Sequence, residues 1–238
     1  MSEDDAVRKQ GAEPKVPLGS APRLESAALS AAGADAFGAT VFNGDHRPPL
    51  SCYIRTLNEE RLIGEVVAAA LRIAREVIVV DSGSTDATVE RAAEAGADVR
   101  HQDWLGNGRQ KRAGEELCAY DWLLDLDADE VVTPELAAEI AALFKTGAPA
   151  AQTAADSKWG AEPKSTLGSA PARSVYTVPL VTAPPVGQPW RGTDVARRAK
   201  LYDRRMHRMP DHAAWDQLEL KRGTKIGRLK GALLHYSF

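Results

Sequence analysis

An acidic run near the middle of the chain has the residue types of a metal and phosphate site. The run is Asp125-Leu126-Asp127-Ala128-Asp129-Glu130, between the strand-like Asp121-Trp122-Leu123-Leu124 and a helix start at Thr133-Pro134-Glu135. Carboxylates crowded at a strand end repel one another unless a cation lies between them. Mg²⁺ and Mn²⁺ prefer carboxylate oxygens, and a bound diphosphate completes their coordination. A solvated turn that caps the next helix would have the same composition, so the run alone does not decide between the two.

Two further polar turns follow strand-like runs. The apolar run from Glu76 to Asp81 is typical of a buried parallel strand and leads into Ser82-Gly83-Ser84-Thr85-Asp86. The run Leu50 to Arg55 leads into Thr56-Leu57-Asn58-Glu59-Glu60, after which apolar residues recur with helical spacing. Ligands of open α/β sheets bind beyond the carboxyl ends of the strands. We therefore expect the acidic residues of these turns at one sheet edge, in the layout of a nucleotide-binding fold.

Together these segments resemble the inverting family 2 glycosyltransferases, and within them the lipopolysaccharide-core β-glucosyltransferase branch. The resemblance covers about residues 49–145 and 175–238. It implies an α/β protein of the GT-A (nucleotide-diphospho-sugar transferase) fold, with a Rossmann-like, mostly parallel sheet and a mixed C-terminal extension. The segments that carry it are Thr56-Leu57-Asn58-Glu59-Glu60, Val80-Asp81-Ser82-Gly83-Ser84-Thr85-Asp86, Trp104 through Lys111, and Leu126-Asp127-Ala128-Asp129-Glu130.

The resemblance also implies roles for single residues. Asp81 would accept a hydrogen bond from the base of the nucleotide, although a cap of its own strand end is the structural alternative. Asp127 would contact the ribose or the metal, and Asp129 would bind the metal directly. A divalent cation, Mn²⁺ or Mg²⁺, would be held by Asp127, Asp129 and His235. The nucleotide-sugar donor would be bound by Thr56, Asn58, Glu59, Asp81, Ser82, Arg109, Lys111 and Asp127.

The catalytic base is assigned to Asp216. The family carries a His-Glu pair before its last strands, and its Glu would deprotonate the acceptor; the matching residues here are Trp215-Asp216. Asp keeps the carboxylate with one methylene fewer, and Trp replaces a titratable ring by a stacking face. Asp211 and Glu219 stay open as alternative bases.

The implied activity is metal-dependent transfer of a sugar, with inversion, from a UDP-sugar or a related donor to a saccharide or lipid-linked saccharide. Its setting would be the synthesis of cell-envelope polysaccharide or lipopolysaccharide. One alternative is a non-catalytic sugar-nucleotide-binding protein, because the base motif is altered. Another is a sugar nucleotidyltransferase, but that class usually has a Gly-rich basic loop where this chain has Thr56 to Glu60.

Composition narrows the partners and the location. A net charge of −3 and a pI of about 6.0 give no global sign of nucleic-acid binding. The stretch from Arg191 to Lys230 is nevertheless basic, which suits either a solvated surface or contact with phosphates of the substrates or of an anionic membrane. Cys52 and Cys118 have no metal or redox spacing and read as core thiols. We expect a cytoplasmic protein with peripheral contact at the inner face of the plasma membrane.

The chain also divides by composition. Residues 1–47 are rich in Ala, Gly, Ser and Pro and are expected to be a disordered extension. A nucleotide-sugar-binding half is expected at 48–145, a low-complexity insertion at 146–173, and an acceptor-side half of the same domain at 174–238. The insertion holds Gly160 to Pro171, a near copy of Gly11 to Pro22, which reads as duplicated linker.

Overall fold

The computed structural model describes residues 47–146, 148–149, 169–183 and 196–236. The expected disordered extension lies almost wholly outside these residues. So do the first copy of the repeat and most of the 146–173 insertion. From the insertion, the structure describes a two-stranded sheet in which β6 (Ala148–Pro149) pairs antiparallel with β7 (Ser169–Ala170).

The first half of the chain forms the parallel part of a large sheet. Its strands lie in the order β3-β2-β1-β4, and all three pairings are parallel. The strands predicted after residues 50, 76 and 121 are confirmed, whereas the short, largely exposed β3 was not expected. The elements are β1 (Leu50–Thr56), α2 (Ile63–Leu71), β2 (Glu76–Asp81), α3 (Thr88–Glu94), β3 (Asp98–His101), α4 (Asn107–Leu117) and β4 (Trp122–Asp127).

The second half extends the same sheet with mixed strand directions. β9 pairs antiparallel with β4 and with β8, β11 runs parallel to β8, and β5 closes the order antiparallel to β11. The predicted mostly parallel sheet with a mixed extension is therefore confirmed, while the predicted domain boundaries stay a prediction. The elements are β5 (Glu130–Val132), α5 (Pro134–Thr146), β8 (Val175–Ala183), β9 (Ala196–Asp203), β10 (Gly227–Arg228), which pairs with β8, and β11 (Leu233–Tyr236).

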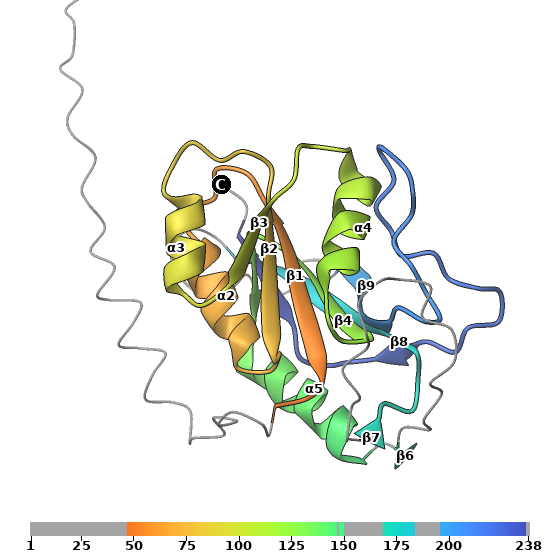
Figure 1. The fold of residues 1–238 in the computed structure, drawn as a ribbon. Coiled ribbons are helices and arrows are strands. Elements are labelled where there is room, and N and C mark those ends of the chain that lie inside the picture. The colour runs from red at the N-terminus through yellow and green to blue at the C-terminus, as the bar shows by residue number, and fades with distance from the viewer. Residues whose placement is uncertain (1–46, 147, 150–168, 184–195, 237–238) are drawn as a thin grey trace, which may run out of the picture. The chain divides into compact units, whose positions relative to one another are not determined.

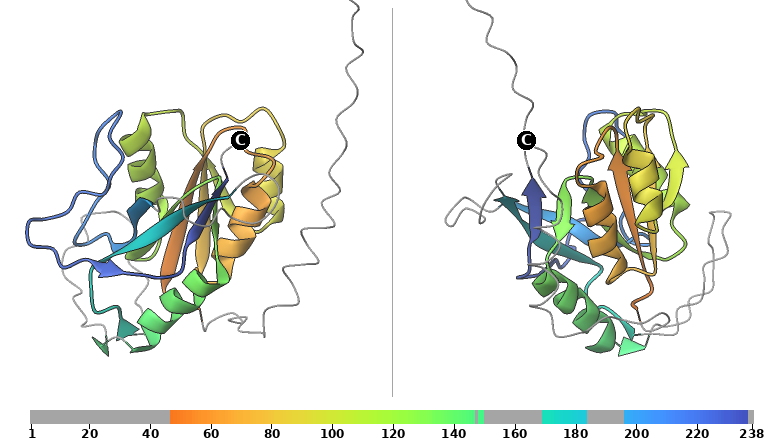
Figure 2. Two further views of the ribbon diagram at one scale, coloured as in Figure 1. Left: turned by 180° about the vertical axis from the view of Figure 1, so that it is seen from behind. Right: turned by 90° about the vertical axis from the view of Figure 1, so that its left-hand side faces the viewer.

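The two faces of the sheet are covered by different helices. Figures 1 and 2 show α2 and α3 on one side and α4 on the other. On β1, Ile54 points into the larger core with α2 and α5, whereas Tyr53 lies on the face that α4 covers. Successive strand residues alternate between faces. Arg55 and Asp125 therefore fall on the α4 face near the carboxyl ends of β1 and β4, where the site is found.

Both cysteines are buried and free, as expected of core thiols. Cys52 lies in β1, and Cys118 directly follows the last residue of α4. Among the described residues, no helix is long and apolar enough to cross a membrane.

Candidate active site

The turns after β1 and β2 are bound to each other. Asn58 donates from its backbone N–H to Ser84 Oγ at 2.9 Å, and its Oδ1 accepts from the backbone N–H of Thr85 at 2.8 Å. Its φ of 55° is left-handed, a conformation that Asn tolerates better than most residues. Glu59 donates from its backbone to Thr88 Oγ1 at 2.7 Å. These two predicted donor-binding residues therefore shape the turns, and their contacts with a nucleotide stay a prediction.

Asp81 and Thr56 lie at the ends of neighbouring strands, paired in register. The Asp81 carboxylate accepts from the backbone N–H groups of Gly83 and Ser84, both at 3.0 Å, so it caps its own turn as the structural alternative proposed. Ser82 Oγ accepts from the Gln110 amide at 3.0 Å. The buried Thr56 Oγ1 has no hydrogen-bond partner among the residues that the structure describes. A ligand hydroxyl or carbonyl at this edge would satisfy it.

Arg55 joins three parts of the chain. Its guanidinium donates to Asp127 at 2.7 Å, to the Asn107 side chain at 3.0 Å and to Asp216 at 3.2 Å. These partners come from β4, from the first turn of α4 and from the loop after β9. One side chain thus ties the predicted metal and donor residue Asp127 to the predicted base Asp216.

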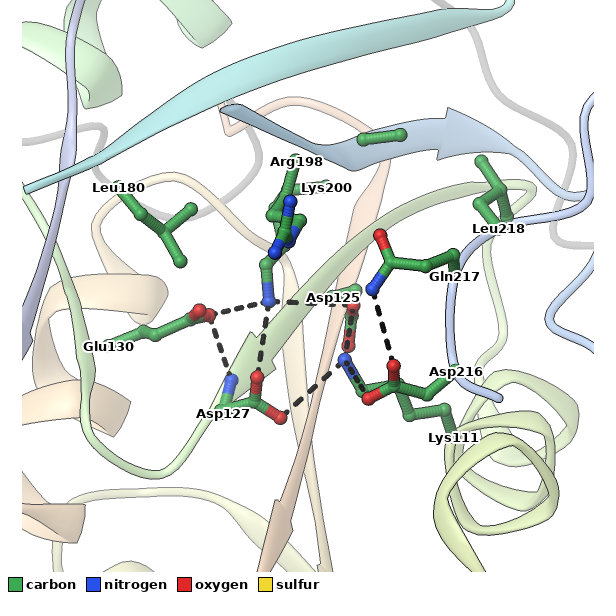
Figure 3. Close-up of a pocket in the computed structure, with 11 residues that line it drawn as sticks. Lys111, Asp125, Asp127, Glu130, Leu180, Arg198, Lys200, Asp216, Gln217 and Leu218 are labelled. Carbon is green, nitrogen blue, oxygen red and sulfur yellow. Dashed lines mark hydrogen bonds and ion pairs between the residues drawn. The ribbon is translucent and has the colours of Figure 1, made fainter. Parts of the chain in front are cut away.

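Two buried lysines complete the charge network. Lys111 Nζ lies 2.8 Å from Asp125 and 3.8 Å from Asp216, and Lys200 Nζ lies 2.7 Å from Glu130 and 3.5 Å from Asp125. Figure 3 shows these side chains converging from β4, β9 and α4 on one cavity. The cavity has a volume of about 240 Å³ and is lined by Lys111, Asp125, Asp127, Glu130, Leu180, Arg198, Ala199, Lys200, Asp216, Gln217 and Leu218.

Burial and charge act against each other in this network. Burial alone would raise the pKa of Asp127, but Lys200, Lys111 and Arg55 together hold it well below its usual range. Burial would lower the pKa of Lys200, yet its three carboxylate neighbours raise it well above the ordinary value. The pKa of Glu130 is raised, mainly by burial. Asp127 and Lys200 therefore carry full opposite charges at neutral pH.

The three candidate bases occupy different places. Asp216 lines the cavity, between Arg55 and Lys111. Asp211 lies outside it and pairs with Arg109 at 2.7 Å on the surface, and the exposed Glu219 pairs through its backbone with Arg208. The geometry favours Asp216 over both alternatives. Arg109, which is predicted to bind the donor, forms an ion pair with Asp211 in this structure. Its donor-binding role stays a prediction.

The loop that carries Asp216 is held against the start of α4. The backbone N–H groups of Asn107 and Gly108 donate to the carbonyls of Ala213 and His212, at 2.6 and 3.1 Å. The first N–H groups of a helix usually need such partners. A Cβ on Gly108 would lie 2.3 Å from the carbonyl oxygen of Trp215, so only glycine allows this approach. The Trp215 side chain is 59% exposed and free to stack on a ligand.

Asp129 and His235 form a separate pair at the end of the sheet. Asp129 Oδ2 lies 3.1 Å from His235 Nε2, and the backbone of Tyr236 donates to the Asp129 carbonyl at 3.0 Å. Burial raises the pKa of Glu59, and the charge of Asp129 raises it further, so negative charge is in excess here. The described residues hold no group of three or more His, Cys, Asp or Glu side chains placed for a metal. The pair fits a cation that takes its other ligands from substrate and water.

Some network residues had no role predicted from the sequence: Arg55 and Lys200 were not singled out, and Asp125 and Glu130 belonged to the acidic run without a role of their own. Arg55 and Asp125 are charged residues at alternating positions of apolar strands, on the same face as Tyr53 and Leu123. This alternation could have indicated the two residues from the sequence, because a charged side chain within a buried strand needs a partner. Nothing local points to the partners of these two residues, which include Asn107 for Arg55 and Lys200 for Asp125.

Comparison with known proteins places the chain in a family. The model of glycosyl transferase family 2 matches residues 51–206. An uncharacterized glycosyltransferase from Rickettsia felis is 45% identical over 95 residues, which are 40% of this chain and 34% of the relative. The lipopolysaccharide core biosynthesis glycosyltransferase LpsC from Rhizobium meliloti is 40% identical over 87 residues, 34% of this chain and 32% of the relative. The chain thus spans about a third of the length of these curated relatives.

Among solved structures, glucosyl-3-phosphoglycerate synthase from Mycobacterium tuberculosis, in complex with Mg²⁺ and UDP, is 30% identical with a TM-score of 0.32. The match covers 36% of this chain and 34% of that one. The family match, in contrast, spans most of the described sheet, from β1 to β9, and includes the acidic turn at Asp127 and Asp129. The sheet order agrees with the GT-A fold expected from the motifs. The chain belongs to the family 2 glycosyltransferases.

Proposed function

We propose that the chain transfers a sugar, with inversion and with the help of a divalent cation, from a UDP-sugar to a saccharide or lipid-linked saccharide. The observation that carries the proposal is the meeting of Asp216 with Arg55 and Lys111 beside Asp127. A carboxylate from the second half of the chain is thereby brought to the edge that holds the donor motifs. The similarity to LpsC supports a role in lipopolysaccharide or other cell-envelope polysaccharide synthesis.

The residues of the cavity divide the work of an inverting displacement. Asp216 accepts the proton of the acceptor hydroxyl while the oxygen of that hydroxyl forms a bond to the anomeric carbon of the donor. The bond from that carbon to the diphosphate breaks in the same step, and the diphosphate leaves. Arg55 and Lys111 hold the Asp216 carboxylate in place, which keeps base and acceptor aligned. The turns at Asn58 and Asp81 would hold the nucleoside.

Asp129 and His235 would hold the cation, Mn²⁺ or Mg²⁺. When bound, it would neutralise the charge that develops on the leaving diphosphate. Asp127 pairs with Arg55 and Lys200, and its contribution as a third ligand stays a prediction. A cytoplasmic location, with peripheral contact between the basic stretch and an anionic membrane, completes the proposal.

Calorimetry with UDP, with Mn²⁺ and with EDTA, tests the donor site. We expect UDP to bind much more tightly with Mn²⁺, and Asp129→Ala to remove that difference while the thermal unfolding temperature stays similar. Equal affinity with EDTA and with Mn²⁺ contradicts the metal assignment.

The base is tested by turnover of labelled UDP-sugars. Asp216→Asn should lower kcat by about 10²–10⁴-fold, the usual effect of losing a general base. Asp211→Asn is the matched control, because this carboxylate comes from the same loop but lies outside the cavity. Loss of turnover in the control alone would show that the base is misassigned. UDP binding without any turnover favours the non-catalytic alternative.

A further inference from the structure

The cations around the cavity differ in how their charge is compensated. Lys111 and Lys200 each have carboxylates within 4.0 Å. Arg198 also lines the cavity, but no ion pair or side-chain hydrogen bond ties its guanidinium to any residue of the described ranges. Its charge is therefore available to a ligand.

A local irregularity of β9 brings Arg198 to the cavity. In the pairing with β8, Tyr176 lies opposite Leu201 and Thr177 lies opposite Ala199, so Lys200 is an extra residue on β9. Such a bulge turns side chains away from the regular alternation and is common next to active sites. Here it allows the consecutive residues Arg198, Ala199 and Lys200 all to line the cavity. Figure 3 shows Arg198 and Lys200 at the same end of it.

Asp125 and Gln217, which also line the cavity, provide hydrogen-bonding groups for a ligand. Asp125 is 2% exposed, and its Oδ1 has no hydrogen-bond partner in the part of the chain that is described. An unpaired buried carboxylate oxygen is costly unless a ligand or water donates to it. Gln217 adds an amide, which donates to Asp216 at 3.2 Å. The hydroxyl groups of a sugar are donors of the kind that the Asp125 oxygen requires.

We propose that the cavity binds an acceptor saccharide that carries an anionic group, a phosphate or a carboxylate, and that Arg198 binds this group. The sugar hydroxyls would face Asp125 and Asp216, and the anionic group would face Arg198 at the end lined by β9. This inference rests on the proposed function, since it specifies the acceptor for the same site. It makes Arg198 a residue that determines acceptor specificity.

Binding of simple probes to the UDP- and Mn²⁺-saturated protein tests the inference. Glucose 6-phosphate, glucuronate and glucose represent the phosphate, the carboxylate and the uncharged case. We expect an anionic probe to bind on the order of tenfold to a hundredfold more tightly than glucose, the range of a charged hydrogen bond. Arg198→Gln should abolish this preference, and Arg198→Lys should keep part of it. Arg228→Gln is the matched control, because Arg228 is an exposed arginine of β10 outside the cavity.

The outcomes separate this inference from the function on which it rests. UDP binding that is normal in the Arg198 variants shows that they are folded and that the donor site is intact. If UDP binds but anionic probes show no preference over glucose, or Arg198→Gln keeps the preference, the inference is wrong and the proposed function stands. A preference lost equally in Arg228→Gln places the anion elsewhere on the basic stretch and also overturns it. If UDP itself does not bind, the proposed function fails first.

Discussion

Replacing Gly108 by alanine adds only a methyl group, but we expect a large loss of catalytic activity. Gly108 lies in the first turn of α4, and its N–H donates to the carbonyl of His212. A Cβ there would lie 2.3 Å from the carbonyl oxygen of Trp215 and 2.8 Å from those of His212 and Pro210. All three atoms belong to the backbone, so no side-chain rotation relieves the overlap. Either the helix or the loop that carries Asp216 has to move.

The magnitude follows from two opposing effects. Alanine in place of glycine stabilises a helix by up to about 1 kcal/mol. Overpacking against rigid neighbours costs about 1–3 kcal/mol. We expect a net loss of about 1–2 kcal/mol, which for a protein of this size lowers the unfolding temperature by about 3–6 °C. A displacement of Asp216 by about 1 Å would lower kcat by on the order of 10²-fold.

Thermal unfolding, UDP calorimetry and turnover measure these effects together. Gly64→Ala is the matched control, since Gly64 also lies in the first turn of a helix, but its Cβ would have only one neighbour, at 3.9 Å. The control should be as stable as the wild type or more so, with unchanged turnover. For Gly108→Ala we expect lower kcat and intact UDP binding. Wild-type turnover in Gly108→Ala would show that the interlock between α4 and the loop does not position the base.

The remaining predictions concern the donor edge. Burial alone would raise the pKa of Asp127, but the three surrounding cations lower it from the ordinary 3.8. The ionised carboxylate therefore stabilises the fold above about pH 4, and this effect is lost as the pH falls further. In urea unfolding, the wild type should therefore be more stable than Asp127→Asn at pH 7 and lose that advantage progressively below pH 4; a constant difference contradicts the lowered pKa. Thr56→Val removes a buried oxygen that has no partner among the described residues, so stability should hold or rise while UDP affinity falls about fivefold. Thr88→Val removes a bonded hydroxyl and should instead cost about 1–2 kcal/mol, so equal loss of stability in both would argue against a ligand role for Thr56.

Local sequence patterns were sufficient to predict the main strands of the sheet, but not the ion pairs that connect the residues of the cavity. The strands that end at Thr56, Asp81 and Asp127 were predictable because buried parallel strands are continuous apolar runs followed by turn residues. The family motifs added the mixed extension. The short β3 and β5 were missed, since runs of this length carry little periodic signal.

The partners of Arg55 could not be predicted in the same way. Asp216 is separated from Arg55 by 161 positions, and no local pattern specifies a contact of that range. The position of Arg198 depends on the bulge at Lys200, which hydrophobic alternation does not reveal. The capping of α4 by His212 and Ala213 is likewise a tertiary contact, which no local pattern in the Gly106 to Lys111 segment specifies.

The pairing of β4 with β9 has a consequence for synthesis of the chain. Asp127 and Lys200 are 73 positions apart, so at ordinary translation rates β4 emerges roughly 4–15 s before its antiparallel neighbour. During that interval one edge of a hydrophobic strand is open to other nascent chains. Charged side chains on an open edge discourage such association. Asp125 and Asp127 place negative charge on that open strand, and they acquire Lys200 as a partner only when β9 closes the sheet.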